Sequence, residues 1–140
     1  MLPLRLVLDT NILVSAALKP ASLQSTALLL ALTRPARLYV SSAILAEYRD
    51  VLSRPELHIS KGIRLQLLQL IRNRSHLVNP SRRLEVCSDP DDNRFLEAAD
   101  KAGADYLITG NMRHFPAFWK KTKIISSREF ISLAAPHLLG

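Results

Sequence analysis

A short apolar segment that ends in a carboxylate constrains the fold of this chain more than any other feature of the sequence. Leu6, Val7 and Leu8 are followed directly by Asp9 and then by small polar residues. An apolar run without polar alternation is typical of a strand that is covered on both faces. Between residues 12 and 17 the apolar residues recur every three or four positions, which indicates a helix. The chain is therefore expected to begin with a buried strand that places Asp9 at its carboxyl end, where open α/β sheets bind their ligands.

Strand-like and helical patterns alternate along the rest of the chain. Further strands are expected at residues 38–40, 105–109 and 123–125, and further helices at residues 22–33, 42–53, 60–74, 91–102 and 126–135. Residues 77–78 are open between strand and loop, and residues 112–119 are expected to form a helical turn or loop. The alternation predicts an α/β fold, a three-layer α/β/α sandwich with a mostly parallel central sheet of four to five strands. Since no repeat or linker interrupts the pattern, residues 1–140 are expected to form a single domain.

The charge of the chain narrows the class of partner. The formal net charge is +7 and the isoelectric point is near 10.1. Such a charge favours a polyanionic partner, because Lys and Arg displace counterions from phosphates, although a merely solvated surface remains an alternative. Cys87 is the only cysteine, which excludes an intrachain disulfide and a zinc cluster of thiolates. The longest apolar stretch, residues 27–32, is too short to cross a bilayer, and the amino terminus lacks the order of a signal peptide. A cytoplasmic protein without a membrane partner is expected.

Two later carboxylates fall on the apolar sides of their helices. Glu47 lies within the apolar stripe of the helix expected at residues 42–53, and Asp92 is in phase with the apolar stripe of the helix expected at residues 91–102. A carboxylate that points inward is costly unless it finds a partner or a metal ion. With Asp9, these residues make three inward carboxylates, which are expected to meet at one edge of the sheet around one divalent ion.

Three carboxylates at one place favour a hard cation. Oxygen ligands select Mg²⁺ or Mn²⁺ over zinc, and such an ion leaves positions open for water and phosphate oxygens. Asn111, which follows the strand at residues 105–109, offers a further amide oxygen. A basic surface around such a site is the expected arrangement for hydrolysis of a phosphodiester bond.

Each of these assignments has a structural alternative. Asp9 can instead cap a helix, Glu47 can pair with an Arg inside the fold, and Asn111 can be an ordinary turn residue. The carboxylates of Asp91 and Asp92 are also favoured in a first helical turn by the helix dipole. Three further residues lie beside the site segments and either contact phosphate or belong to the plain surface: Arg94, Arg113 and His114.

Four segments together resemble a known family. Residues 7–13, 42–48, 89–96 and 104–111 are similar to the motifs of PIN-domain (PilT N-terminal) proteins and occur in that family's order. The likeness is greatest to the VapC-like ribonucleases that act as toxins of toxin–antitoxin systems. The resemblance implies an α/β/α sandwich and metal-dependent cleavage of RNA. It also implies a cognate antitoxin as a protein partner and leaves a homodimer open.

The resemblance assigns roles to residues by position. It implies that Asp9, Glu47 and Asp92 are the catalytic acids. The same three residues, with Asn111, would then bind Mg²⁺ or Mn²⁺. The polar residues that support them would be Asn11, Thr109 and Asp91.

Position 111 departs from the pattern, because many members carry an Asp there and an amide brings no charge. The departure motivates a second reading, a catalytically weakened PIN-like module that binds RNA or a partner without cutting. A third reading is a phosphatase of the haloacid-dehalogenase type, which also begins with a strand that ends in Asp. That class requires a second Asp two residues later, where this chain has Asn11.

Overall fold

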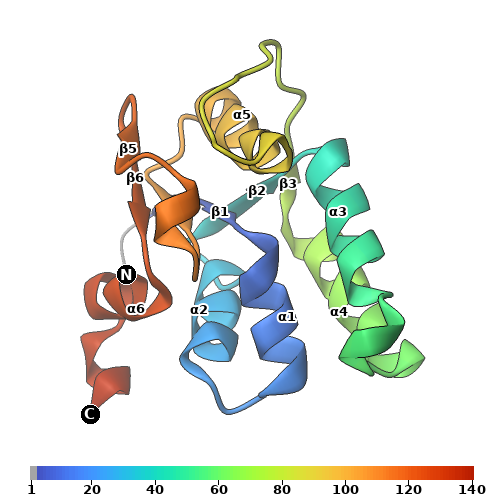
Figure 1. Ribbon diagram of the computed structural model, residues 1–140. Helices are drawn as coiled ribbons and strands as arrows, with labels where there is room; N and C mark the ends of the chain where they lie inside the picture. The colour runs from blue at the N-terminus through green and yellow to red at the C-terminus, as the bar shows by residue number, and fades with distance from the viewer. Residues whose placement is uncertain (1–2) are drawn as a thin grey trace.

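The computed structural model describes residues 3–140, and strands alternate with helices along them (Figure 1). The strands are β1 (Arg5–Leu8), β2 (Arg37–Val40), β3 (His76–Leu77), β4 (Tyr106–Ile108), β5 (Phe118–Trp119) and β6 (Thr122–Ile125). The α-helices are α1 (Thr10–Leu18), α2 (Leu23–Ala31), α3 (Ser42–Leu52), α4 (Lys61–Arg74), α5 (Asn93–Ala102) and α6 (Ser127–Ala134). Short 3₁₀ turns cover Pro55–Leu57, Pro90–Asp92, Met112–His114 and Pro136–Leu139.

The strands form one sheet in the order β3-β2-β1-β4-β6-β5. All neighbouring pairs are parallel except β5 and β6. The expected mostly parallel α/β sheet is confirmed, but it has six strands rather than four to five. Strand β3 falls on the segment at residues 77–78 that the sequence leaves open between strand and loop, and β5 is the additional strand. Each has two residues, which is too short for a periodic pattern to decide. Residues 118–119 were expected in a turn or loop, and instead they pair with the start of β6 as an antiparallel hairpin.

Helices cover both faces of the sheet, as the sandwich requires. In Figure 1, α5 lies on one side of the strands and α1 and α2 lie on the other, with α3 and α4 beside β3. Leu6, Val7 and Leu8 of β1 have no exposed surface, as expected for a central strand that is covered on both faces. The largest buried side chains around them include Tyr48 and Phe95, and the hydroxyl of Tyr48 donates a hydrogen bond to the carbonyl of Leu8. This bond ties α3 to the end of β1.

The strand order has a switch point at the centre of the sheet. From β1 the chain moves to β2 and then β3 on one side, and it later returns to β4 on the other side of β1. Crevices at such switch points, at the carboxyl ends of parallel strands, are where open α/β sheets bind ligands. Asp9 follows β1 and Thr109 follows β4, so both residues lie at this point.

Helix α5 is fixed at both of its ends. At its start, the side-chain oxygen of Asn93 accepts hydrogen bonds from the N–H groups of Val86 and Cys87, which holds the preceding loop against the helix. At its end, Gly103 has φ = 61° and forms the left-handed cap that glycine adopts without strain. The helix was expected from residue 91, but residues 90–92 form a 3₁₀ turn in front of it.

Within residues 3–140 no single helix is long and apolar enough to cross a membrane. Helices α1 and α2 reach such a length and apolar composition only together, and they are bent by 119° relative to one another.

Candidate active site

Asp9 occupies the end of β1 with both carboxylate oxygens engaged. Its Oδ1 accepts a hydrogen bond of 2.7 Å from the N–H of Thr10, so Asp9 is also the N-cap of α1. Its Oδ2 accepts a hydrogen bond of 2.7 Å from the hydroxyl of Thr109 and one of 3.2 Å from Nδ2 of Asn11. The cap that the sequence left as an alternative is therefore present, and together with the bonds to Oδ2 it fixes the orientation of a carboxylate that is only 6% exposed. Asn11 is itself held, because its Oδ1 accepts a hydrogen bond from the N–H of Gly110.

Glu47 reaches the same place from α3. Its side chain is 18% exposed, and its Oε2 accepts a hydrogen bond from the hydroxyl of Thr10, the residue next to Asp9. Its Oε1 lies 3.8 Å from Nη1 of Arg94 at the start of α5. The ion pair that the sequence left open as an alternative for Glu47 thus exists at the edge of the site.

Asp92 and Asp91 differ sharply in their surroundings. The side chain of Asp92 is 15% exposed, and its Oδ2 is buried without a hydrogen-bond partner within residues 3–140. Asp92 precedes α5 but does not cap it, since its side chain makes no hydrogen bond to the first turn. Asp91 is 71% exposed and pairs with Arg94 at 3.1 Å. The structure therefore directs Asp92 toward the site and Asp91 toward solvent.

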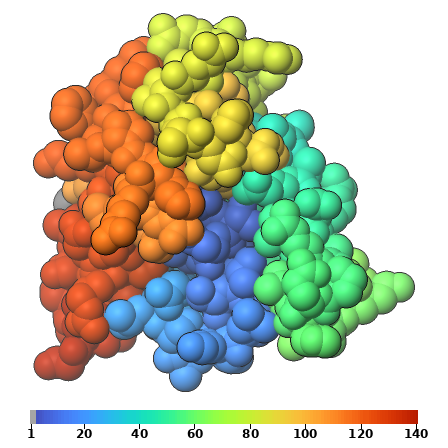
Figure 2. All heavy atoms as spheres, viewed as in Figure 1, coloured from blue at the N-terminus to red at the C-terminus, as the bar shows by residue number. Residues whose placement is uncertain are grey.

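The remaining predicted residues lie around this edge. The N–H of Asn111 donates to the hydroxyl of Thr109, which places the backbone of the turn at the site, but the Asn111 side chain is exposed. His114 Nδ1 lies 3.5 Å from Asp92 Oδ2. Arg113 is exposed and Arg94 lies between Glu47 and Asp91. Figure 2 shows the segments that carry these residues meeting on one face, with the start of α1 in blue, the start of α5 in yellow and the turn after β4 in orange.

The carboxylates of this cluster are harder to ionise than usual. Burial raises the pKa of Asp9, although the hydrogen bonds from Thr109 and Thr10 work in the opposite direction. Burial also raises the pKa of Glu47, against the hydrogen bond from Thr10 and the charge of Arg94. Burial, followed by the charge of Asp9, raises the pKa of Asp92 to about 6 from its ordinary value of 3.8. Each of these groups would therefore gain from a neighbouring positive charge.

The raised pKa of Asp92 predicts a pH-dependent cost of folding in the absence of metal. With a pKa of about 6 in the folded state and 3.8 in the unfolded state, the folded protein binds more protons between these values. The contribution of Asp92 to the free energy of unfolding therefore falls as the pH rises from 4 to 6, and the full penalty remains above pH 6. In EDTA, Asp92→Asn is expected to unfold at a higher temperature than the wild type at pH 7.5, with a difference that shrinks toward pH 4. Thermal denaturation at several pH values measures this, and a variant less stable than wild type at pH 7.5 would contradict it.

The donor set of the site fits a hard divalent cation. Three carboxylates with raised pKa, one of them with a buried oxygen that makes no hydrogen bond within residues 3–140, are the kind of oxygen ligands that Mg²⁺ and Mn²⁺ prefer. The expectation that Asp9, Glu47 and Asp92 meet around one ion is not met by the side chains as they stand, because within residues 3–140 no three His, Cys, Asp or Glu side chains lie close enough together to hold an ion. In this arrangement the positive charge beside Glu47 is the guanidinium of Arg94.

Two polar groups of the site were not anticipated from the sequence. The hydroxyl of Thr10 links Glu47 to the start of α1, and the N–H of Gly110 holds the Asn11 side chain. A hydroxyl residue directly after a strand-terminal Asp was the available signal for Thr10. The bond from Gly110 could not be predicted from the sequence, because it is made by a backbone N–H and not by a side chain.

Comparisons with known proteins cover most of the chain. Residues 5–113 match the PIN domain family. An uncharacterized protein of Methanocaldococcus jannaschii is 30% identical over 111 residues, which cover 77% of this chain and 71% of that protein. A chain in the crystal structure of VapBC2 from Rickettsia felis, bound to a fragment of promoter DNA, superimposes with a TM-score of 0.59. That likeness covers 87% of this chain and 98% of the other at 18% identity, which supports the fold alone.

Proposed function

This chain belongs to the PIN-domain family, and we propose that it is an endoribonuclease that hydrolyses phosphodiester bonds of RNA with the help of Mg²⁺ or Mn²⁺. The observation that carries the proposal is the position of Asp9 at the switch point of the sheet, with Glu47 joined to the neighbouring Thr10 by a hydrogen bond and with the charges of Asp9 and Glu47 acting on Asp92. Buried polar atoms are ordinarily hydrogen-bonded, whereas the buried Oδ2 of Asp92 has no hydrogen-bond partner among residues 3–140 and lies 3.5 Å from Nδ1 of His114.

The residues of the site would bind the ion or orient the residues that bind it. Asp9, Glu47 and Asp92 would hold the ion, with Asn111 as a further oxygen donor. A bound divalent ion supplies positive charge to the phosphate and lowers the pKa of a bound water. Thr109 orients the carboxylate of Asp9 through its hydroxyl, together with the amide of Asn11.

Cations next to the acids would receive the polyanion. Arg94 lies between Glu47 and Asp91 at the edge of the site, and its guanidinium would exchange these carboxylates for an incoming phosphate group. Arg113 and His114 flank the same edge from the turn after β4. A guanidinium can contact two phosphate oxygens at once, which suits it to positioning a strand.

A cleavage assay on total RNA tests the proposal. We expect cleavage in the presence of Mn²⁺ or Mg²⁺ and none in EDTA, because three carboxylates alone repel phosphate. The assay is read on a denaturing gel together with an RNA-binding measurement on the same sample. RNA binding without cleavage at any metal concentration would contradict the nuclease proposal and leave the RNA-binding module, which the neutral, exposed Asn111 favours.

Membership of the PIN-domain family argues against the phosphatase interpretation. The dehalogenase-like phosphatase loses its basis, since the chain matches another family and Asn11 holds Asp9 where that class needs an acid.

We further propose that the chain is the toxin of a toxin–antitoxin pair in the cytoplasm, supported by the fold shared with a chain of VapBC2. Growth arrest on expression, relieved by a small protein encoded beside it, is the expected behaviour. Gel filtration of the purified chain tests the homodimer.

A further inference from the structure

Both carboxylate oxygens of Glu47 are already engaged within the acidic cluster, which consists of Asp9, Glu47 and Asp92. The Oε2 of Glu47 accepts a hydrogen bond from the hydroxyl of Thr10, and its Oε1 lies 3.8 Å from Nη1 of Arg94. Within residues 3–140, Glu47 is the one member of the cluster that contacts a guanidinium. An ion that binds Glu47 would therefore meet a positive charge that is already beside this carboxylate.

The guanidinium of Arg94 is held in this position by acceptors on two sides. Its Nε donates a hydrogen bond of 2.8 Å to the carbonyl of Asp91, and its Nη2 donates one of 3.1 Å to Oδ1 of the same residue. Its Nη1 donates one of 3.4 Å to the carbonyl of Ala43 in the first turn of α3. The side chain is only 25% exposed. The charge beside Glu47 is thus fixed by the turn before α5 and by the start of α3.

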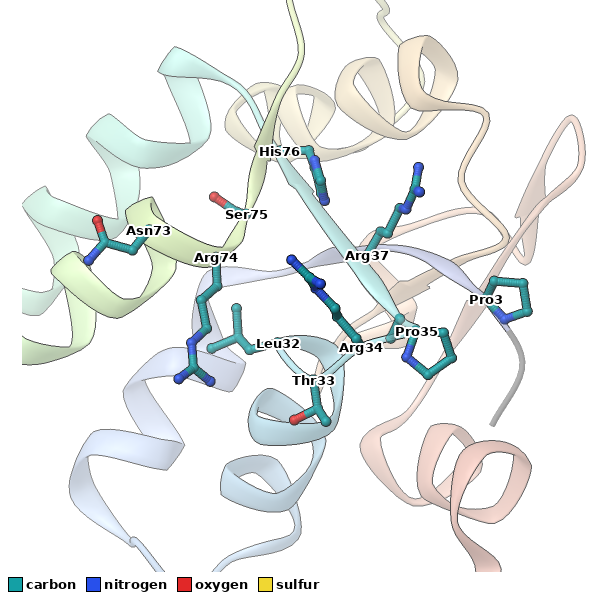
Figure 3. Close-up of a pocket in the computed structure, with 11 residues that line it drawn as sticks. Pro3, Leu32, Thr33, Arg34, Pro35, Arg37, Asn73, Arg74, Ser75 and His76 are labelled. Atoms are coloured by element: carbon teal, nitrogen blue, oxygen red, sulfur yellow. The ribbon is translucent and has the colours of Figure 1, made fainter.

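Several other arginines carry their charge without a carboxylate partner. A hollow of about 730 Å³ is lined by Arg34 and Arg74, among others, and within residues 3–140 no carboxylate lines it (Figure 3). Arg49 lies on the same helix as Glu47, but it is exposed and forms no ion pair in the described part of the chain. Water and salt screen charges of this kind from a distant site. Arg94 is distinguished from them by its contact with Glu47.

Arg94 supplies part of the positive charge that a bound ion would supply. Burial raises the pKa of Glu47, and the hydrogen bond from Thr10 and the charge of Arg94 act in the opposite direction. A guanidinium and a divalent cation therefore satisfy the same need of this carboxylate. Two cations beside one carboxylate also repel each other. Their occupation of the site is expected to be competitive.

We propose that the contact between Arg94 and Glu47 is inhibitory: the guanidinium takes the place of a divalent cation beside this carboxylate and has to withdraw before Glu47 can bind one. The contact would lower the affinity of the acidic cluster for Mg²⁺ and Mn²⁺. The withdrawn guanidinium would then be available to a phosphate group of the RNA, a step that rests on the proposed function. Binding of the ion and binding of the strand would thereby favour each other, since each removes the same guanidinium from Glu47.

Calorimetric titration of the RNA-free protein with Mn²⁺ tests the inhibitory contact separately from catalysis. Arg94→Gln is expected to bind Mn²⁺ about tenfold more tightly than the wild type, because the competing charge is removed while all three carboxylates remain. The matched control is Arg49→Gln, which removes the same charge from the helix that carries Glu47. It should change the affinity less than about threefold, because no contact with the acidic cluster is lost.

Thermal denaturation provides a second readout and shows whether the variants fold. In EDTA, Arg94→Gln is expected to unfold at a lower temperature than the wild type, because the charge of Glu47 loses its partner. Mn²⁺ should then raise the unfolding midpoint of the variant by more than that of the wild type, since stabilisation by a ligand follows its affinity. Arg94→Met, which keeps the apolar stem without the charge, should give the same result.

Two outcomes of the titration would overturn the inhibitory contact. One is an Mn²⁺ affinity in folded Arg94→Gln and Arg94→Met that is no higher than in the wild type. The other is an equal gain of affinity in Arg49→Gln, which would show a general effect of net charge. Because no RNA is present, absence of cleavage in the assay on total RNA would leave this result intact.

Discussion

Asp92→Asn is expected to lower Mn²⁺-dependent cleavage of RNA by about 10²- to 10³-fold, the usual effect of losing one charge aimed at the reacting centre, and to leave the protein folded. The substitution keeps the shape and one oxygen of the side chain but removes its charge. Asp92 makes no hydrogen bond to the first turn of α5, and its Oδ2 has no hydrogen-bond partner within residues 3–140, so the substitution removes only the 3.5 Å contact of this oxygen with Nδ1 of His114. Single-turnover cleavage of a labelled RNA measures the loss.

The neighbouring residue provides a matched control for this prediction. Asp91→Asn makes the same chemical change one position earlier, at a side chain that is 71% exposed and paired with Arg94. It is expected to change the cleavage rate less than about threefold, as a surface ion pair is worth little. A larger loss in Asp91→Asn than in Asp92→Asn would show that Asp91 is the functional acid. Full activity in both variants would show that neither Asp91 nor Asp92 takes part in cleavage.

The cleavage assay and the thermal denaturation of Asp92→Asn together distinguish a functional role of Asp92 from a structural one. A residue that serves only the fold stabilises it, so its replacement lowers stability. Asp92 is expected to behave in the opposite way, because its charge is buried at a cost and its pKa is about 6. A variant that is more stable and inactive is characteristic of a residue retained for function.

Much of the architecture was predictable because it follows from local periodicity. The central strand at residues 6–8, the helix over residues 42–53 and the strand at residues 123–125 each carry apolar patterns that few other structures satisfy. The inward phase of Glu47 was predictable for the same reason, since a helix has a fixed period. Asp92 lies in the 3₁₀ turn before α5, so its burial does not follow from the helical period that predicted it. The place of Glu47 near Asp9 follows from parallel strands that end at one edge, because α3 begins where β2 ends.

The features that the sequence concealed depend on contacts between distant segments. Residues 77–78 were left open between strand and loop, and it is the pairing of His76 and Leu77 with β2 that decides for a strand. The contact of α2 with α6 follows from the docking of segments that lie far apart in the sequence. Local propensity carries no information on such contacts. The pairing of Glu47 with Arg94 belongs to this class, because the residue type was foreseeable but the partner was not.

The second prediction separates a structural role of Glu47 from a catalytic one. Glu47→Gln is expected to reduce cleavage by about 10²- to 10³-fold, because it removes one of three charges that would hold the ion. Arg94→Gln breaks the same ion pair, whose atoms are 3.8 Å apart, but it leaves all three carboxylates in place. It is expected to reduce cleavage less than about tenfold, chiefly through weaker binding of RNA.

The double variant that combines Glu47→Gln with Arg94→Gln closes a thermodynamic cycle. If Glu47 serves only as the partner of Arg94, either single change breaks the pair, so both lose activity equally and the double variant loses no more. If Glu47 acts on the metal ion, the double variant cleaves more slowly than Glu47→Gln, by the same factor by which Arg94→Gln alone slows the wild type. Thermal denaturation of all three variants guards against loss of the fold, since Glu47 also accepts the hydroxyl of Thr10. Equal losses in the two single variants would assign Glu47 to the fold and leave the acidic cluster with two members, too few to support the proposed hydrolysis.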